Sequence, residues 1–558
     1  MTRRYLATAA LALALLAGCS DDDDDDVINP PDTPATPSGL AAAGQEDGTI
    51  VVTWNASTGA TAYVLERAVA TAPTEFDAIG GDIATTTYTD DEVTPGTGYM
   101  YRVAAKNAEG TSAFSATVAA SEPGDDVEII TGPITADRTL SAGTVYVLQG
   151  YVKVQPGVTL TIEPGTRIVG DFETKGSSLW ILRGARIDAQ GTAAAPIVFT
   201  SEQPEGSRKP GDWGGILIFG NGVSNRSGVI ESEGPTGVSE QYSGGTDNTD
   251  DSGILRYVRI EFAGYDVTGT GQELNALSSY AVGNGTTYEY IQTLAGLDDS
   301  FEYWGGAVDG RYLASFESGD DHFDWTEGYR GRNQFVIAYQ STRLVPAAGT
   351  GGISSDPQGF EADGCPAGEA GCTAGNATEP FSMPVWANFT LIGAAPPAAL
   401  STSGDVGMVL RRGTGGFLTH GIVARWQRQG VSIRDAQSGA HMDNDSLMVV
   451  NILLAENGTN YDDDAGSNFA KSAAFATSNH VLAGGPVSGL LQSLTPGAGN
   501  FLQPGAGSPA ASVTGAIGIP SEFTGSFFGG TLTPADYYGA VDPAGTPWFV
   551  GWTSYAPN

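Results

Sequence analysis

The stretch EYIQTLAGLDDSFEYWGG, Glu289 to Gly306, is followed by RYLASFESGDDHFDWTEG, Arg311 to Gly328, and the two stretches repeat each other. Their aligned residues keep one offset of 22 residues, and the pairs are Tyr290 with Tyr312, Asp298 with Asp320, Asp299 with Asp321, Phe301 with Phe323 and Glu302 with Asp324. A period of this length is typical of one coil in a solenoid of stacked strands, in which aligned residues lie ~4.8 Å apart. The repeat therefore predicts a stacked-strand fold with six carboxylates on two neighbouring rungs.

The same pattern of short strands and glycine turns fills the chain from residue 127 to the C-terminus. Examples are YVKVQPGVTLTIEPGTRIVGD, GDWGGILIFGNG and GILRYVRIEFAG, and amphipathic helical periodicity is missing throughout. The composition agrees, because the chain has 78 glycines and only 16% charged residues. Coils of such strands bury an inward apolar ladder and remove most sheet edges, which favours a solenoid over a flat sheet.

Sequence motifs in residues 127–558 also resemble those of a known family. The segment resembles the right-handed parallel β-helix domain of bacterial surface lipoproteins, of the broad pectin-lyase-like architecture, in IEPGTRI, APIVFTS, GDWGGI, GILRYVRIEFAG, DDSFEYWGG, GDDHFDWTEG and PWFVGWT. The resemblance implies the fold and a surface location. It implies no activity, because this architecture hosts lyases, hydrolases, adhesins and passive stalks.

Residues 37–122 form a different unit of short alternating strands. They resemble a fibronectin type III domain, with Trp54 at the buried tryptophan position and PGTGYMYRV, Pro95 to Val103, at the tyrosine corner. Such modules are usually spacers. The expected fold class is therefore all-β: a fibronectin type III β-sandwich followed by a long right-handed parallel β-helix.

The N-terminus is predicted to be a targeting segment. Arg3 and Arg4 precede an apolar run, Leu6 to Leu16, that is too short to span a bilayer. The following Leu16-Ala17-Gly18-Cys19 looks like a lipobox, which implies a signal peptide over residues 1–18 and lipidation of Cys19; an ordinary cleaved signal is the alternative.

Residues 19–36 are then an acidic and Pro-rich tether with six aspartates, Asp21 to Asp26. Ser20 and these aspartates resemble the acidic export tag of surface-exposed lipoproteins. We therefore expect a lipid anchor in the outer membrane, with the protein on the cell surface.

The charge balance limits the partners. The net charge is −38, from 64 acidic and 26 basic residues, so a phosphate-binding basic patch is not expected and nucleic acid is excluded as a partner. An acidic surface fits an extracellular protein or one that holds cations.

The cysteines and histidines give little sign of a transition-metal site. Cys365 and Cys372, in CPAGEAGC, are expected to form a disulfide in an exported protein, and a metal site is the weaker alternative because no CxxC word or histidine accompanies them. The four histidines share no ligand spacing, so zinc is not expected.

The stacked acids need a physical explanation, because like charges ~5 Å apart repel by about 1 kcal/mol in water and by several at an effective dielectric of about 20. Calcium is one answer, since it takes six to eight oxygen ligands. The alternatives are ion pairs with Arg311, Arg330 or Arg332, or acceptance of backbone N–H bonds. The calcium hypothesis names Asp298, Asp299, Glu302, Asp320, Asp321 and Asp324.

Aromatic side chains surround these acids. An exposed platform of aromatic rings beside carboxylates suits sugar rings, so the ligand-binding hypothesis names Tyr303, Trp304, Trp325, Tyr329, Arg330 and Arg332. For at least two of the four aromatic residues, packing in the core is favoured over exposure.

Three functions follow from these features. The leading one is non-catalytic, namely adhesion to a polysaccharide or a partner protein at the cell surface. The second is a calcium-dependent carbohydrate-active enzyme, a polysaccharide lyase or glycoside hydrolase, since stacked carboxyls can meet the spacing of glycoside hydrolysis. The third is a purely structural spacer. Duplication of the acids on successive rungs favours a ladder over a catalytic centre.

Overall fold

The computed structural model describes residues 33–45, 48–69, 76–93, 98–121, 126–267, 272–394, 404–463, 480–481, 486–513, 518 and 530–555. The predicted signal peptide, Cys19 and the tether up to residue 32 lie outside the described residues. The chain divides into two compact units, Met1–Pro123 and Gly124–Asn558. Among the described residues, no helix has the length and apolar character needed to cross a membrane.

The first unit consists of antiparallel strands in two sheets. One sheet holds β1 (Ala41–Gly44), β2 (Ile50–Thr53) and β5 (Thr87–Asp90), and the other holds β3 (Ala62–Val69), β4 (Asp77–Ile83), β6 (Gly98–Asn107), β7 (Gly110–Thr111) and β8 (Val118–Ser121). Trp54 is buried against Tyr63, with ring centroids 5.4 Å apart. The buried Tyr101 hydroxyl of β6 donates a 2.7 Å hydrogen bond to the Asp90 carboxylate of β5, which ties the two sheets together at the predicted corner.

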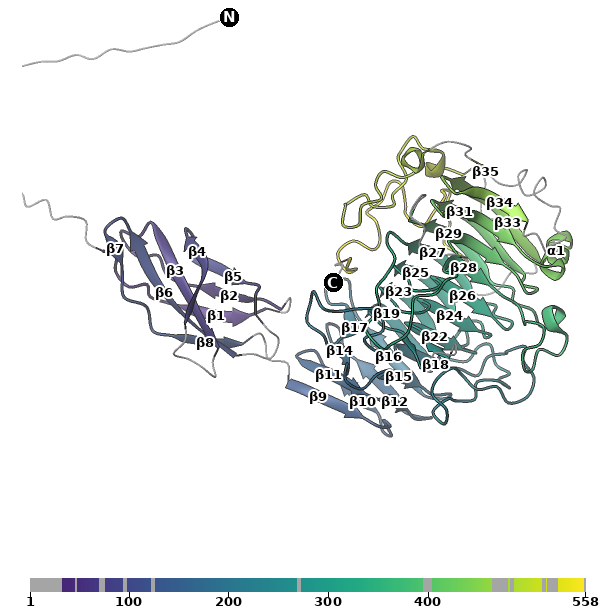
Figure 1. Ribbon diagram of the computed structural model, residues 1–558, viewed down its shortest axis with the longest axis horizontal. Helices are drawn as coiled ribbons and strands as arrows, with labels where there is room; N and C mark the ends of the chain where they lie inside the picture. The colour runs from purple at the N-terminus through teal and green to yellow at the C-terminus, as the bar shows by residue number, and fades with distance from the viewer. Residues whose placement is uncertain are drawn as a thin grey trace, which may run out of the picture. The chain divides into compact units, whose positions relative to one another are not determined.

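The second unit is built on two long parallel sheets whose strands follow one another like rungs (Figure 1). We call them the fifteen-stranded sheet and the ten-stranded sheet. The fifteen-stranded sheet contains β9 (Asp126–Thr131), β10 (Arg138–Leu140), β11 (Thr144–Gln149), β13 (Thr159–Ile162), β14 (Arg167–Gly170), β16 (Arg186–Gln190), β17 (Ile197–Ser201), β19 (Gly253–Glu261), β23 (Thr287–Leu294), β25 (Asp309–Phe316), β27 (Arg332–Tyr339), β29 (Val385–Ile392), β31 (Gly416–Ala424), β33 (Leu447–Ala455) and β35 (His480–Val481).

The ten-stranded sheet contains β12 (Tyr151–Val154), β15 (Ser178–Ile181), β18 (Ile216–Phe219), β22 (Leu277–Tyr280), β24 (Phe301–Trp304), β26 (Phe323–Thr326), β28 (Gln358–Ala362), β30 (Val406–Leu410), β32 (Gln429–Ile433) and β34 (Thr459–Asp463). A small hairpin of β20 (Tyr265–Asp266) and β21 (Glu273–Leu274), one α-helix and three short 3-10 turns complete the described elements; the helix is α1 (Ala436–Asp443), and the turns are Gly375–Ala377, Val487–Gly489 and Pro509–Ala511. Because the strands alternate between sheets and pair in parallel with the next coil, the predicted all-β fold with a long parallel β-helix is confirmed.

Single residues in the left-handed region bend the chain at the corners of the coils. In β19, residues before Tyr257 pair with β16 and residues after it pair with β17, and Tyr257 itself has φ 49°. Tyr290 and Tyr312 occupy the same position in the next two coils, with φ 54° and 59°. The three rings stack with centroids 4.4 and 4.5 Å apart. Stacking along the corner offsets the strain of about 1–2 kcal/mol that such a backbone conformation costs.

The interior of the coils is an apolar ladder, and it confirms the period of the repeat. Phe301 pairs with Phe323 in the ten-stranded sheet, 22 residues later, and their stacked rings have centroids 4.8 Å apart. Two described residues near the C-terminus contact the fifteen-stranded sheet: Trp552 meets the ring of Tyr257 edge-on, and the Ser554 carbonyl accepts from the Gln292 amide.

Candidate functional site

Alternation along the ten-stranded sheet brings carboxylates to its outer face. In β24, Phe301 and Tyr303 point into the core, so Glu302 points outward. Glu302 pairs in register with Asp324 of β26, and Asp324 pairs with Glu361 of β28. Three acids therefore occupy one column on three consecutive rungs.

Sequence reasoning missed Glu361, because a long loop between β27 and β28 breaks the 22-residue offset. The stretch QGFEADG nevertheless repeats the Phe-Glu pair of DSFEYWGG, and this pair indicates the third rung.

Asp299 and Asp321 lie in a second column, at the start of the same rungs. The Asp299 carboxylate accepts a 2.8 Å bond from the backbone N–H of Asp321, and the Asp321 carboxylate accepts a 2.5 Å bond from the backbone N–H of Gln358. Amide side chains continue the column at both ends, since Asn275 accepts from the N–H of Asp299 and Gln358 accepts from the N–H of Val406. The alternative that these acids cap the backbone is thus confirmed for this pair.

The two columns and the turn before them form one cluster. Three groups of acids each offer carboxylate oxygens within 4.8 Å of one another: Asp298, Asp299 and Asp320; Asp299, Glu302 and Asp324; and Asp321, Asp324 and Glu361. We call these seven residues, Asp298, Asp299, Glu302, Asp320, Asp321, Asp324 and Glu361, the acid cluster. All six residues of the calcium hypothesis belong to it.

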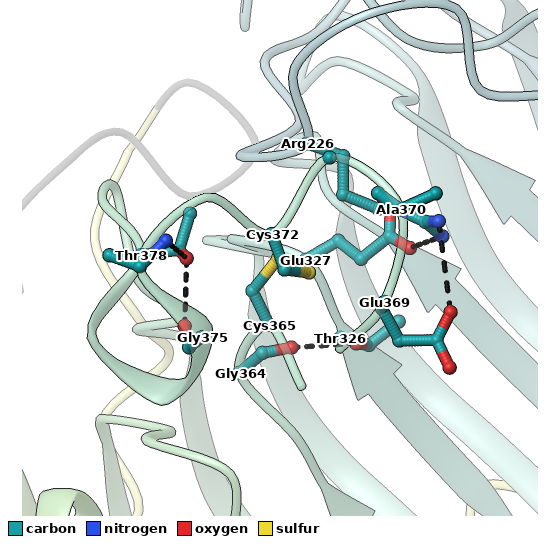
Figure 2. Close-up of a disulfide and its surroundings, with 12 residues drawn as sticks. Arg226, Thr326, Glu327, Gly364, Cys365, Glu369, Ala370, Cys372, Gly375 and Thr378 are labelled. Carbon is teal, nitrogen blue, oxygen red and sulfur yellow. Dashed lines mark hydrogen bonds and ion pairs between the residues drawn. A yellow bond between two sulfur atoms is a disulfide. The ribbon is translucent and has the colours of Figure 1, made fainter. Parts of the chain in front are cut away.

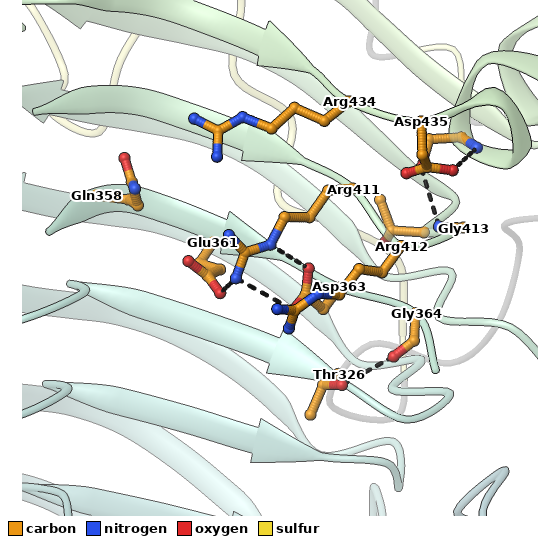
Figure 3. A network of polar contacts seen from close by, with 12 residues as sticks. Thr326, Gln358, Glu361, Asp363, Gly364, Arg411, Arg412, Gly413, Arg434 and Asp435 are labelled. Carbon is orange, nitrogen blue, oxygen red and sulfur yellow. Dashed lines mark hydrogen bonds and ion pairs between the residues drawn. The ribbon is translucent and has the colours of Figure 1, made fainter. Parts of the chain in front are cut away.

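Within the described ranges of the chain, arginines pair with acids at one end of the acid cluster. Arg411, after β30, pairs with Glu361 and, at 2.9 Å, with Asp363, and Arg412 pairs with Asp363 at 2.5 Å (Figure 3). The alternative that Arg311 pairs with these acids is wrong, because Arg311 pairs with Glu289 at 2.5 Å on the fifteen-stranded sheet. Arg332 begins β27 of that same sheet, and Arg330 lies in the turn before it.

Burial and mutual repulsion favour the protonated form of the cluster. Burial raises the pKa of Asp320 to about 8 and the pKa of Asp324 to about 7. Burial, followed by the charges of neighbouring carboxylates, also raises the pKa of Asp298 and of Glu302 well above its ordinary value. One carboxylate oxygen of Asp320 and one of Asp324 are buried without a hydrogen-bond partner among the described residues. These oxygens lack the donors or the cation that a buried carboxylate requires.

The predicted aromatic platform is not exposed, so that part of the ligand-binding hypothesis is wrong. Trp325 and Tyr329 are 0% exposed, Tyr303 is 1% exposed and Trp304 is 8% exposed. Tyr303, Trp325 and Tyr329 belong to the core of the coils. Trp304 does point outward, but it stacks on Tyr280 with a centroid distance of 4.2 Å in a ladder that the loop after β18 covers.

A polar tie holds that covering loop next to the acid cluster. Arg226 of the loop pairs with the buried Glu327 at 2.7 Å, and the Tyr242 hydroxyl donates to Glu327 at 2.7 Å. Arg226 also donates to the Ala370 carbonyl, inside the loop that the disulfide between Cys365 and Cys372 closes (Figure 2). These residues belong to no common sequence motif, so the fold brings them together.

Substitution of Asp299 separates its role as an acceptor from its charge. In a buffer without divalent cations, Asp299→Ala should lower the free energy of unfolding by about 1–3 kcal/mol, because the Asp321 N–H loses its acceptor. Asp299→Asn keeps an acceptor oxygen and removes a repelling charge, so it should be neutral or stabilising. Chemical denaturation of both variants measures the difference. Equal destabilisation by both would contradict the ladder.

A comparison with known protein families agrees with the β-helix of the second unit. The profile of a family described as "Pectate-lyase like beta helix domain" matches residues 132–488. Solved fibronectin type III structures match a shorter part. The Fn3-like protein from Clostridium thermocellum is 34% identical over 16% of this chain and 94% of its own, with a TM-score of 0.15, and the FN1–FN3 domains of chicken CNTN1 are 23% identical over 16% and 34%, with a TM-score of 0.14. No curated protein matches the chain.

Proposed function

We propose that this chain, which belongs to the pectate-lyase-like β-helix domain family, is a non-catalytic binding protein of the cell surface that holds calcium in its acid cluster. Its ligand is a polysaccharide or a partner protein. The observation that carries the proposal is that three sets of acids share members. Within each set, the carboxylate oxygens lie within 4.8 Å of one another. Two of these carboxylates, Asp320 and Asp324, keep an unpartnered buried oxygen among the described residues.

The chemistry of the cluster favours calcium over other metals. All seven members offer carboxylate oxygens and none offers sulfur or nitrogen, which suits a hard cation. Calcium accepts irregular sets of six to eight oxygens at ~2.3–2.6 Å, whereas magnesium demands a regular octahedron. A cation also removes the repulsion that otherwise raises the pKa of these acids.

The same geometry favours binding over catalysis. Asp299 and Asp321 already use carboxylate oxygens to accept backbone N–H bonds, as residues of a structural ladder do. Asp298, Asp320 and Asp324 are the partly exposed members, so a ligand oxygen would reach a bound cation from their side. Hydroxyl and carboxylate oxygens of a glycan, or an acidic side chain of a protein, suit such an open coordination position.

The lipid anchor remains part of the proposal. Cys19 follows a lipobox-like word, and the six aspartates after it fit an extended tether outside the cell. In a Gram-negative host, we expect the full chain in the outer-membrane fraction and accessible to external protease. Cys19→Ala should move it out of that fraction. An unchanged distribution of this variant would contradict lipidation at Cys19.

A calcium-dependent carbohydrate-active enzyme is the second candidate. It is favoured by the raised pKa of Asp320, about 8, and of Asp324, about 7, because a carboxyl that keeps its proton near neutral pH can act as a general acid. Release of reducing ends or unsaturated uronates from an acidic glycan panel tests it. If the protein degrades one of these glycans and Asp324→Asn abolishes that activity, the enzymatic function is supported over the binding function.

A glycan array tests the leading function. The full chain should bind at least one acidic glycan in calcium, and a chelator should weaken that binding at least tenfold. The double variant Asp320→Asn/Asp324→Asn should lose the calcium dependence. Asp188→Asn, a partly exposed acid of β16 on the other sheet, is the matched control and should bind like the unaltered protein. Equal binding in calcium and in chelator would contradict a role for calcium. If the protein binds no glycan and no surface protein, the structural spacer is the function that is supported.

A further inference from the structure

A cluster of three arginines lies on the outer face of the fifteen-stranded sheet. Arg167 of β14 and Arg259 of β19 both pair with Val198 of β17, one on each side, so their backbones lie two strand spacings, ~10 Å, apart. Arg208 extends from the loop after β17. Its burial and the charges of Arg167 and Arg259 lower the pKa of Arg208, so the three guanidinium groups share one environment.

Carboxylates do not balance these arginines. Arg259 pairs with the buried Glu261 at 2.7 Å, and the charge of Glu261 also acts on Arg208. The ion pair of Arg208 itself is with Glu205, which is 3.9 Å away and 85% exposed. Arg167 has no ion pair within the described part of the chain, and its Nε is buried without a hydrogen-bond partner. In a protein with a net charge of −38, this is a local excess of positive charge.

A hydroxyl group beside the arginines also lacks a partner. Thr200 lies two residues after Val198 and therefore points from the same face of β17. Its side chain is 1% exposed, and its Oγ1 has no hydrogen-bond partner among the described residues. Buried donors without acceptors are rare in native proteins. The Arg167 Nε and the Thr200 hydroxyl are two such donors on the same outer face of the neighbouring strands β14 and β17.

We propose that Arg167, Arg208 and Arg259 bind a tetrahedral oxyanion, a sulfate or phosphate group, with the Thr200 hydroxyl as an additional donor. Guanidinium groups present planar forks of N–H donors that match such oxygens, and three of them suit an ion with three or more acceptor oxygens. The site lies on the other sheet from the acid cluster and goes beyond the proposed function. The group is either a free ion or an ester carried on a glycan.

Isothermal titration calorimetry on the full chain, in a buffer free of phosphate and sulfate and at constant ionic strength, tests the proposal. Inorganic sulfate and inorganic phosphate should bind saturably and more tightly than acetate. Arg167→Gln should weaken binding at least tenfold. The control is Arg138→Gln, which removes an arginine of the same sheet whose side chain is 29% exposed and paired with Glu128, and it should bind like the unaltered protein. Equal affinity in both variants, or no binding of either ion, overturns the proposal.

Two further measurements separate ligand binding from a structural role. Without an oxyanion, Arg167→Gln should leave the melting temperature unchanged or raise it, because it relieves repulsion among the arginines. A lower melting temperature would assign Arg167 a structural role instead. Arg208→Lys keeps the charge but loses the planar fork, so it should also weaken binding; full affinity in that variant overturns recognition by the guanidinium. If dextran sulfate binds more tightly than inorganic sulfate and unmodified dextran does not bind, the ligand is a sulfate ester on a glycan.

Discussion

In a buffer free of divalent cations, the melting temperature of this protein is expected to fall as the pH rises from about 4 to about 8. Burial raises the pKa of Asp320 to about 8 and of Asp324 to about 7 in the folded chain, whereas an aspartate in the unfolded chain titrates near 3.9. Between these values the folded state binds more protons than the unfolded state, so the free energy of unfolding decreases with pH. Since one unit of pKa corresponds to about 1.4 kcal/mol, the loss is on the order of several kcal/mol.

Thermal melts between pH 4 and pH 8 in a chelating buffer measure this slope. The double variant Asp320→Asn/Asp324→Asn should flatten it, because amides do not titrate, while Asp188→Asn should leave it unchanged. Saturating calcium should flatten it as well, since the cation replaces the protons. A melting temperature that is constant or rises over this range without calcium would contradict the burial of these acids.

Removal of the tryptophan at the centre of the coils should produce the largest loss of stability. Trp386 of β29 is 0% exposed, and its ring lies 4.8 Å from that of Phe360 and 5.1 Å from that of Trp325 between centroids. Trp386→Ala should lower the free energy of unfolding by about 3–5 kcal/mol, because the neighbouring rungs cannot close the cavity.

Denaturant unfolding of the full chain, followed by circular dichroism, gives this value. Trp386→Phe is the matched control and should cost less, because it keeps an aromatic ring and removes an indole N–H that is buried without a partner among the described residues. A loss below about 1 kcal/mol for the alanine variant would mean that the core packing is wrong.

The β-helix was predictable because its physical requirement repeats along the chain. Each coil must present an apolar residue at the same inward position, so Phe301 and Phe323 appear 22 residues apart and pair as expected. The column of Glu302 and Asp324 follows from the same register. The corner residues Tyr257, Tyr290 and Tyr312 also repeat, but their left-handed conformation is invisible in the sequence.

The surroundings of the acids were not predictable, because loops and distant coils supply them. Arg411 reaches the cluster from a later coil, while the nearby Arg311 turns to Glu289. Trp304 points outward as the alternation requires, yet a loop from before the repeat covers it. Periodicity states which face a side chain occupies, and it does not state what covers that face.

The most direct test of the acid cluster as a cation site is the melting curve of the full chain at neutral pH, with calcium and with a chelator. A ligand that binds the folded state alone stabilises it by about 2.7 kcal/mol at a hundredfold excess over its dissociation constant. The melting temperature should therefore rise saturably with calcium, and Asp320→Asn/Asp324→Asn should abolish the rise. Superimposable curves in calcium and chelator would contradict the cation site.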